Sequence, residues 1–326
     1  MKAIAMILPA AMLAVGLAVS TAAAQTEYKL VKTIDLPGDK GGHGDWTTFD
    51  RDTHTVWLSQ SPDHDVVVID AATNKVKGVI PGVENGQGIA LTPEYAFLSD
   101  AKGNATIVVN KRTLQKVATL KPEGKGPNGT NYVPQTGEVY VSTDNNEMTV
   151  FSAKPPFKET AHFTLEPNPA KGGPDVGLYV AAKRRLYQPD DNIVDVIDPG
   201  KHAIVATWNP GVTGDTKPMV YDAKTNHIVL GTTDLKVLVL DAKTGKAIAS
   251  IPVKGKVDET VIDEGARRAF VGDKAGLIEV VDLDRNTLAD ILPSEKNVHT
   301  LTVDPATHVV YVYRNESNKV DVFARR

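Results

Sequence analysis

Short apolar stretches recur along the chain, separated by polar turns rich in Asp, Asn, Gly and Pro. Clear examples are VVVI (66–69), TIVV (106–109), VLVL (237–240) and IEVV (278–281). These runs are rich in β-branched residues and are bounded by turn residues, as buried strands are. The pattern therefore predicts a chain of short strands joined by tight turns.

One unit of this pattern repeats: a strand, a polar turn, a second strand, a loop and a third run that ends in a polar or small residue. Its first hairpin is clearest at residues 49–58, 221–230, 262–271 and 303–312. One marker residue in each second strand gives the series Trp57, Phe97, Tyr140, Tyr187, Val229, Phe270, Tyr311, with spacings of 40, 43, 47, 42, 41 and 41. A marker at the end of each third run gives Asp70, Asn110, Ser152, Asp198, Asp241, Asp282, Ala324, with spacings of 40, 42, 46, 43, 41 and 42. Seven units of four-strand length predict an all-β, seven-bladed β-propeller.

The two ends of the repeat predict how the ring closes. The seventh unit stops after its third strand, near residues 320–323, and lacks a fourth. Residues 28–34, near the other end of the chain, read as a free strand. Pairing of these two segments would remove an open β edge, so we expect one closed domain over residues 25–326.

Several short stretches of the repeat resemble sequences of the YncE-like, YVTN-repeat β-propellers. The stretches Tyr140-Val141-Ser142-Thr143 and Tyr311-Val312-Tyr313-Arg314 are similar to that group's signature without matching it literally. Residues 303–308 resemble the group's first hairpin. The resemblance covers nearly all of residues 28–326 and implies an exported seven-bladed binding or interaction protein.

The first 24 residues read as a secretory signal peptide. Lys2 precedes an uncharged apolar run at 4–19, and Ala22-Ala23-Ala24 form a small-residue cleavage site. The run is shorter than the roughly 20 residues that span a bilayer, and Pro9 interrupts it. We therefore expect a periplasmic or secreted protein without a membrane span after cleavage.

The amino-acid composition excludes several kinds of site and partner. The 326 residues contain no Cys, which excludes disulfides, thiolate metal ligands and a cysteine nucleophile. With 36 basic and 40 acidic residues, the formal charge of −4 gives no general attraction to nucleic acid. The expected partners are a small molecule, an ion or a periplasmic protein, and the expected state is a monomer.

Two sets of polar residues are predicted to surround one end of the central channel. The first precedes the innermost strands and comprises Asp45, Gln87, Asn128, Asp175, Lys217, Asp258 and His299. The second follows the second strands and comprises Gln60, Asp100, Thr143, Asp190, Thr232, Asp273 and Arg314. Trp46 either packs in the core or stacks on a sugar or aromatic ligand. Together these residues predict a ligand site at the channel mouth.

Units six, seven and one add a denser arc of His43, Asp45, Asp258, Glu259 and His299. Carboxylates together with imidazoles suit a divalent metal ion, and the same groups suit acid–base catalysis. A third interpretation is a solvated rim in which Lys217, Lys296 or Arg314 neutralises the acids.

Three functions remain open at this stage. The leading one is an exported propeller that binds a small ligand, ion or partner at its channel mouth. A metal-dependent hydrolase or lactonase is the second, although only Glu84-Asn85 suits its Glu/Asn/Asp metal shell. An accessory or docking protein of periplasmic redox or metal metabolism is the third.

Overall fold

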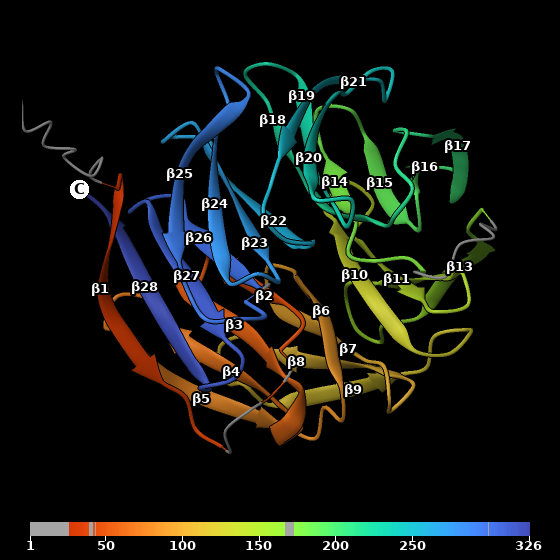
Figure 1. The fold of residues 1–326 in the computed structure, drawn as a ribbon. Helices are drawn as coiled ribbons and strands as arrows, with labels where there is room; N and C mark the ends of the chain where they lie inside the picture. Colours follow the sequence, from red (N-terminus) through yellow and green to blue (C-terminus); the bar gives the residue numbers. More distant parts are fainter. Residues whose placement is uncertain (1–25, 39–41, 43, 167–172, 299) are drawn as a thin grey trace, which may run out of the picture.

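The computed structural model describes residues 26–38, 42, 44–166, 173–298 and 300–326. The predicted signal peptide, His43 and His299 lie outside these residues. The described chain forms seven four-stranded antiparallel sheets, which stand as blades around a central axis (Figure 1). This confirms the seven-bladed β-propeller. No helix in the described ranges is long and apolar enough to cross a membrane.

Each blade contributes one strand to each of four concentric positions. The innermost strands are β2 (Thr47–Asp50), β6 (Gly86–Leu91), β10 (Pro127–Val133), β14 (Leu178–Val180), β18 (Thr216–Asp222), β22 (Val257–Asp263) and β26 (Leu301–Asp304). The second strands are β3 (Thr55–Gln60), β7 (Tyr95–Asp100), β11 (Glu138–Thr143), β15 (Arg185–Asp190), β19 (His227–Thr232), β23 (Arg268–Asp273) and β27 (Val309–Arg314). The third strands are β4 (Asp65–Asp70), β8 (Ala105–Asn110), β12 (Glu147–Ser152), β16 (Ile193–Asp198), β20 (Lys236–Asp241), β24 (Leu277–Asp282) and β28 (Lys319–Arg325). The outermost strands are β5 (Lys75–Pro81), β9 (Lys116–Leu120), β13 (Glu159–Thr164), β17 (Ala203–Trp208), β21 (Ala247–Pro252), β25 (Thr287–Pro293) and β1 (Tyr28–Asp35). A single 3-10 turn, Ser61–Asp63, interrupts the described strands.

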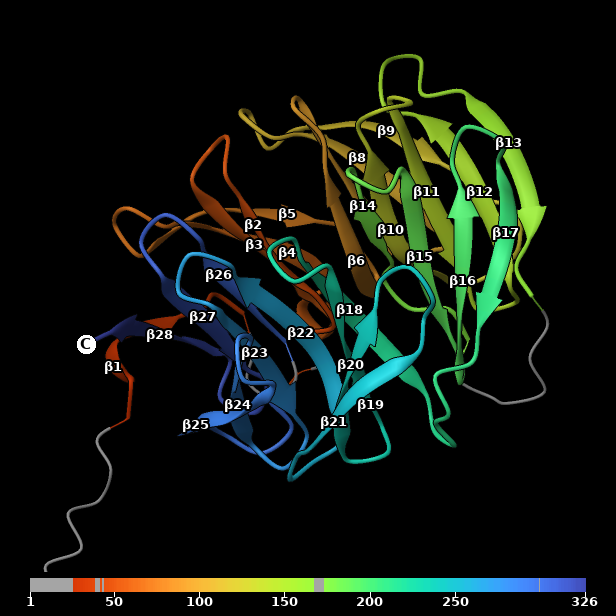
Figure 2. The ribbon, with the colours of Figure 1, turned by 90° about the horizontal axis from the view of Figure 1, so that it is seen from above.

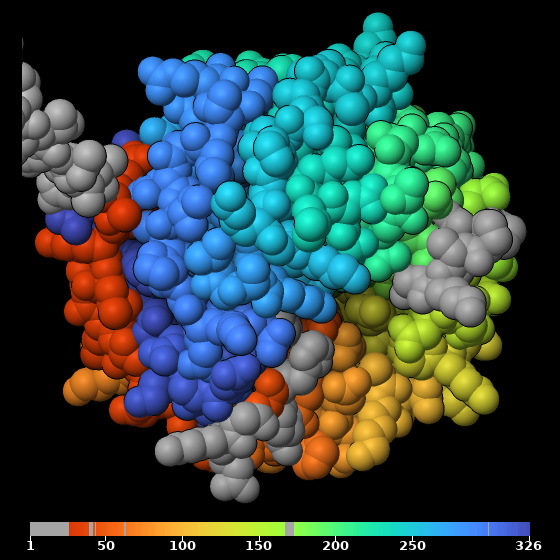
Figure 3. All heavy atoms as spheres, in the orientation of Figure 1, coloured from red at the N-terminus to blue at the C-terminus, as the bar shows by residue number. Residues whose placement is uncertain are grey.

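The ring closes as the sequence predicts. Strand β1 pairs antiparallel with β28, from Tyr28 opposite Arg325 to Asp35 opposite Lys319. The two strands lie side by side in both ribbon views, and the N-terminal red adjoins the C-terminal blue on the surface (Figures 1, 2 and 3). The innermost strands of the first and last blades, β2 and β26, are also in contact. The first and last segments of the described chain therefore share the seventh blade.

The core lies between the blades. Second and third strands are almost fully buried because neighbouring blades cover both of their faces, which explains their uninterrupted apolar runs. The outermost strands alternate between exposed and partly buried residues. Trp57 is fully buried among residues of blades 1 and 2, as its marker position predicts.

Tight turns join the first and second strands of the blades. The Asp that ends the inner strand accepts hydrogen bonds from the turn, as Asp304 does from the Ala306 amide and the Thr307 hydroxyl. The last turn residue has a positive φ, which Asn and His tolerate better than most residues. Here it is His308, with a φ of 61°.

These turns and the nearby turns between third and fourth strands also connect adjacent blades, through contacts of Asp or Glu with Lys, Arg or His that we call the inter-blade belt. Its members are Lys111 with Asp50, His202 with Glu138, Arg267 with Asp222, His308 with Asp263, and His54 with Asp304. The last pair has an Nε2–Oδ2 distance of 3.0 Å and joins blade 1 to blade 7, where the ring closes. The belt therefore stabilises the arrangement of blades as well as the turns.

Substitution of Asp304 by Asn is expected to lower the free energy of unfolding by about 1–3 kcal/mol, because buried donors lose a charged acceptor. Burial alone would raise the pKa of Asp304, but hydrogen bonds from Thr307, Ala306 and His54 outweigh it and lower the pKa. An acid whose folded pKa is depressed stabilises the fold at neutral pH and loses that contribution as the pH falls through the folded value. Urea unfolding between pH 3 and pH 7 should therefore show a smaller acid loss for D304N than for the unchanged protein.

Asp241→Asn is the matched control, because Asp241 caps its turn without an inter-blade cation. Its effect should be smaller. Equal effects of the two substitutions would contradict a stabilising role for the inter-blade pair.

Candidate functional site

Three of the residues predicted to precede the innermost strands lie together at one end of the channel, which we call the N-terminal end. Asp175, Lys217 and Asp258 come from three successive blades and form one ion-paired group. The Lys217 Nζ lies 2.5 Å from Asp175 Oδ2 and 2.9 Å from Asp258 Oδ1. Lys274 Nζ lies 3.3 Å from the other oxygen of Asp258. The structure thus brings part of the predicted set together.

Lys217 carries the positive charge of this group. Its side chain is 18% exposed, so burial favours the neutral amine. The two carboxylates outweigh that effect and raise the pKa of Lys217 above its usual range. At neutral pH an ammonium therefore holds blades 4 and 6 together across blade 5. Asp45 lies close enough to add negative charge at Glu259.

The predicted residues that follow the second strands are mostly buried in the loops beside the channel. Those with almost no exposure are Gln60, Asp100, Thr143, Asp190, Thr232 and Asp273. Asp100 accepts from the amides of Asn85 and Gly103, and Gln60 donates to Pro37, Asp63 and Asn318. Arg314 pairs with Glu295 and Asp321. These contacts of Gln60, Asp100 and Arg314 position the loops, whereas the two carboxylate oxygens of Asp190 have no hydrogen-bond partner among the described residues.

The predicted metal arc is only partly described, since His43 and His299 lie outside the described residues. In the ranges that are described, no three His, Asp or Glu side chains form a group able to hold a metal ion. Asp258 instead pairs with two lysines. Glu259 Oε2 accepts from Thr300 Oγ1 at 2.5 Å and from the Leu301 amide at 2.8 Å. A metal at this arc stays a prediction.

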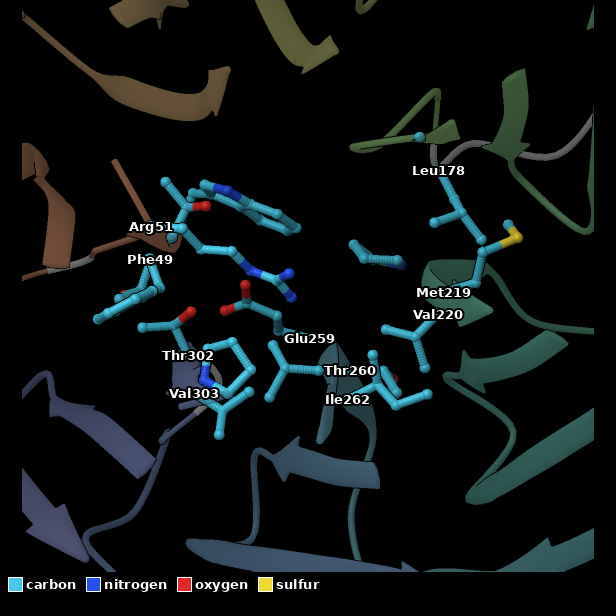
Figure 4. Close-up of a pocket in the computed structure, with 17 residues that line it drawn as sticks. Phe49, Arg51, Leu178, Met219, Val220, Glu259, Thr260, Ile262, Thr302 and Val303 are labelled. Atoms are coloured by element: carbon cyan, nitrogen blue, oxygen red, sulfur yellow. The ribbon is translucent and has the colours of Figure 1, made fainter. Parts of the chain in front are cut away.

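A cavity of about 270 Å³ lies inside the channel, against the innermost strands of blades 1, 4, 5, 6 and 7. Its wall runs from Trp46 and Glu259 towards the C-terminal ends of the strands, where Arg51 and Pro305 lie (Figure 4). Most of the wall between them is apolar and comprises Phe49, Leu178, Met219, Val220, Val261, Ile262 and Val303. Thr47, Thr48, Thr260 and Thr302 add hydroxyl groups. The sequence-predicted sets contribute only Trp46 and Glu259 to this wall.

Glu259 is a buried carboxyl group with an unused oxygen. The residue is 2% exposed, and its Oε1 has no hydrogen-bond partner in the described part of the protein. Burial raises the pKa of Glu259 well above its usual range, against hydrogen bonds from Thr300 and Leu301, while Asp258 and Asp45 raise it further. Burial therefore favours the neutral acid more than it would at an exposed glutamate. Trp46 Nε1 and Thr260 Oγ1 are likewise buried without partners among the described residues.

Arg51 is the charged residue of the cavity wall that sequence reasoning missed. It lies in the first hairpin turn of blade 1, one residue after the Asp that ends β2. Figure 4 shows its side chain extended into the cavity. From sequence alone, a charged residue in a turn is expected to be solvated. Only the direction of its side chain distinguishes Arg51 from other turn residues. Arg51 could have been considered as a channel residue because the C-terminal ends of the inner strands also border the channel.

Comparison with solved structures shows the fold alone. The chain is similar to a chain of Kuenenia stuttgartiensis hydrazine synthase, with a TM-score of 0.77 and 17% identity over 89% of this chain and 97% of that one. It is also similar to the β-propeller domain of Myceliophteria thermophila Cps50 (Swd1), with a TM-score of 0.75 and 12% identity over 92% and 100% of the two chains. No protein-family model and no curated protein sequence matches it. These neighbours support a propeller scaffold, and propeller scaffolds host many functions.

Proposed function

We propose that this protein is an exported β-propeller that binds a small molecule inside its central channel. The observation that carries the proposal is the cavity of about 270 Å³, which combines an apolar wall with unpaired polar groups. Small-molecule sites are concave and mainly apolar, contain a few polar groups and span roughly 300–1,000 Å³. This cavity is just below that range, so its ligand is small.

The ion-paired group at the N-terminal end supports entry from the other side. Lys217 joins residues of blades 4 and 6 there, whereas the cavity extends to exposed Arg51 at the C-terminal ends of the strands. In this proposal the polar residues predicted from the sequence close and shape one end of the channel. The ligand enters beside Arg51.

Export and membership in the YncE-like group complete the proposal. The apolar leader with its Ala22-Ala23-Ala24 site supports export, and the hairpin phrases of the repeat support the family. Expression of the full chain in a bacterium and intact mass measurement of the periplasmic fraction should give a protein that begins at Gln25. A cytoplasmic, uncleaved product would contradict export.

The channel site is tested by filling it. Leu178 is half-buried on β14 and faces the cavity (Figure 4), so Leu178→Trp should occupy ligand space while leaving the blades intact. Thermal-shift screening with small metabolites should give ligands that stabilise the unchanged protein and not L178W. Leu30→Trp, on the exposed side of β1, is the matched control and should keep every response. Equal responses from L178W would contradict a channel site.

A further inference from the structure

We propose that the channel cavity selects a small organic anion with an apolar body, such as an aromatic or branched aliphatic carboxylate, and that Arg51 binds its charged end. This inference rests on the proposed function and specifies the ligand class of the same cavity. The inference depends on the positive charge of Arg51, on the apolar wall of the cavity and on the buried carboxyl group of Glu259.

The first support is that Arg51 has no counter-charge. Within the described ranges its guanidinium makes no ion pair and no hydrogen bond, although the side chain extends into the cavity (Figure 4). A guanidinium offers five donors in a planar fork that matches a carboxylate. Such a group at a cavity entrance is suited to bind an anion.

The second support is that the neighbouring acids are already paired. Four inner strands end in an Asp, and each of these acids contacts a basic side chain of the inter-blade belt: Asp50 contacts Lys111, Asp222 contacts Arg267, Asp263 contacts His308, and Asp304 contacts His54. These pairs leave the acids little attraction for Arg51. The guanidinium of Arg51 therefore keeps its positive charge available to an incoming ligand.

The third support is the wall beyond Arg51. Phe49, Leu178, Met219 and Ile262 lie around the space in Figure 4 and give an apolar surface for the body of the ligand. Glu259 lies in the same wall, with one oxygen saturated by two donors and the other without a partner. Because burial raises the pKa of Glu259, this carboxyl group repels an anion less than an exposed glutamate does. A strongly cationic ligand would meet the positive charge of Arg51 in the same cavity.

The test measures affinity for probes of similar size and different charge. Benzoate and 4-methylpentanoate are the anionic probes, benzamide and benzylammonium are the neutral and cationic ones, and acetate lacks the apolar body. Calorimetric titration at pH 7 should show the anionic probes binding roughly tenfold or more tightly than benzamide and acetate, with no binding of benzylammonium. Arg51→Gln should reduce the affinity for benzoate at least about tenfold and leave that for benzamide unchanged.

Arg51→Gln should fold normally, because Arg51 has no partner in the described structure whose loss would matter. Arg112→Gln, at an exposed turn of blade 2, is the matched control and should bind benzoate as the unchanged protein does. L178W should bind none of the probes.

Three other results would contradict the anion assignment, the channel site or both. If benzamide binds as tightly as benzoate, R51Q has no effect and L178W abolishes binding, the anion assignment is wrong while the channel site stands. If the unchanged protein binds neither anionic probe more tightly than about 10 mM, the assignment is overturned. If the probes bind equally to L178W, both the assignment and the channel site are overturned.

Discussion

A chain that begins at Pro37, and therefore lacks β1, is expected to lose cooperative folding. Tyr28 of β1 packs with Phe270 and other residues of blade 6, at a ring-centroid distance of 5.1 Å. Ile34 packs with Val56 and Val67 of blade 1. Loss of a buried aromatic or large aliphatic side chain costs about 2–5 kcal/mol, and whole domains are stable by only about 5–15 kcal/mol. The deletion also leaves the β28 edge unpaired, which favours aggregation.

Circular dichroism and size-exclusion chromatography of the truncated chain should show loss of the folded monomer. A chain that begins at Thr26 is the control and should unfold at the same urea concentration as a chain that begins at Gln25. A peptide of residues 26–38, added to the truncated chain, should restore folding by completing the seventh blade. An unchanged unfolding midpoint in the truncated chain would show that strand closure is dispensable.

Substitution of Lys217 by Met is expected to destabilise the protein by about 3 kcal/mol at neutral pH, because Asp175 and Asp258 remain as partly buried carboxylates. Burial already raises the pKa of Asp175, and loss of the ammonium removes the charge that opposes this shift. An acid whose folded pKa is raised loses stability as the pH rises through that value. The penalty measured by urea unfolding should therefore be larger at pH 8 than at pH 5.

Lys274→Met provides the comparison, since Lys274 is 43% exposed and pairs only with Asp258. It should cost no more than about 1 kcal/mol. Adding Asp175→Asn and Asp258→Asn to the Lys217 substitution should recover most of the lost stability. If the single substitution K217M were as stable as the unchanged protein at pH 8, the group would have no structural role.

The two proposed stability centres differ in how visible they are in sequence. The closing strand was predictable because the seventh unit lacks a fourth strand and residues 28–34 supply one. Lys217 was predictable as a channel residue and as a candidate for neutralising acids. Its partners were not, because they come from blades 4 and 6 and their pairing depends on how far each side chain reaches across the axis.

The residues around the cavity also differ in how visible their role is in the sequence. Sequence reasoning considered the N-terminal ends of the inner strands, where polar residues are conspicuous. Arg51 lies at the opposite ends, in a turn where a charged residue is ordinary. Five of the six buried residues after the second strands, such as Asp100 and Asp273, accept or donate loop hydrogen bonds, whereas the carboxylate oxygens of Asp190 have no partner among the described residues. Polarity alone does not distinguish such a residue from one that meets a ligand.

The sequence by itself determined the number of blades, the order of the strands and the place of closure. These properties follow from local alternation and from a period of about forty residues. The tertiary structure alone decided which charges are paired, which oxygens are left without partners and where space remains in the channel. Those properties depend on contacts between residues of different blades, and no local pattern specifies the distances between them.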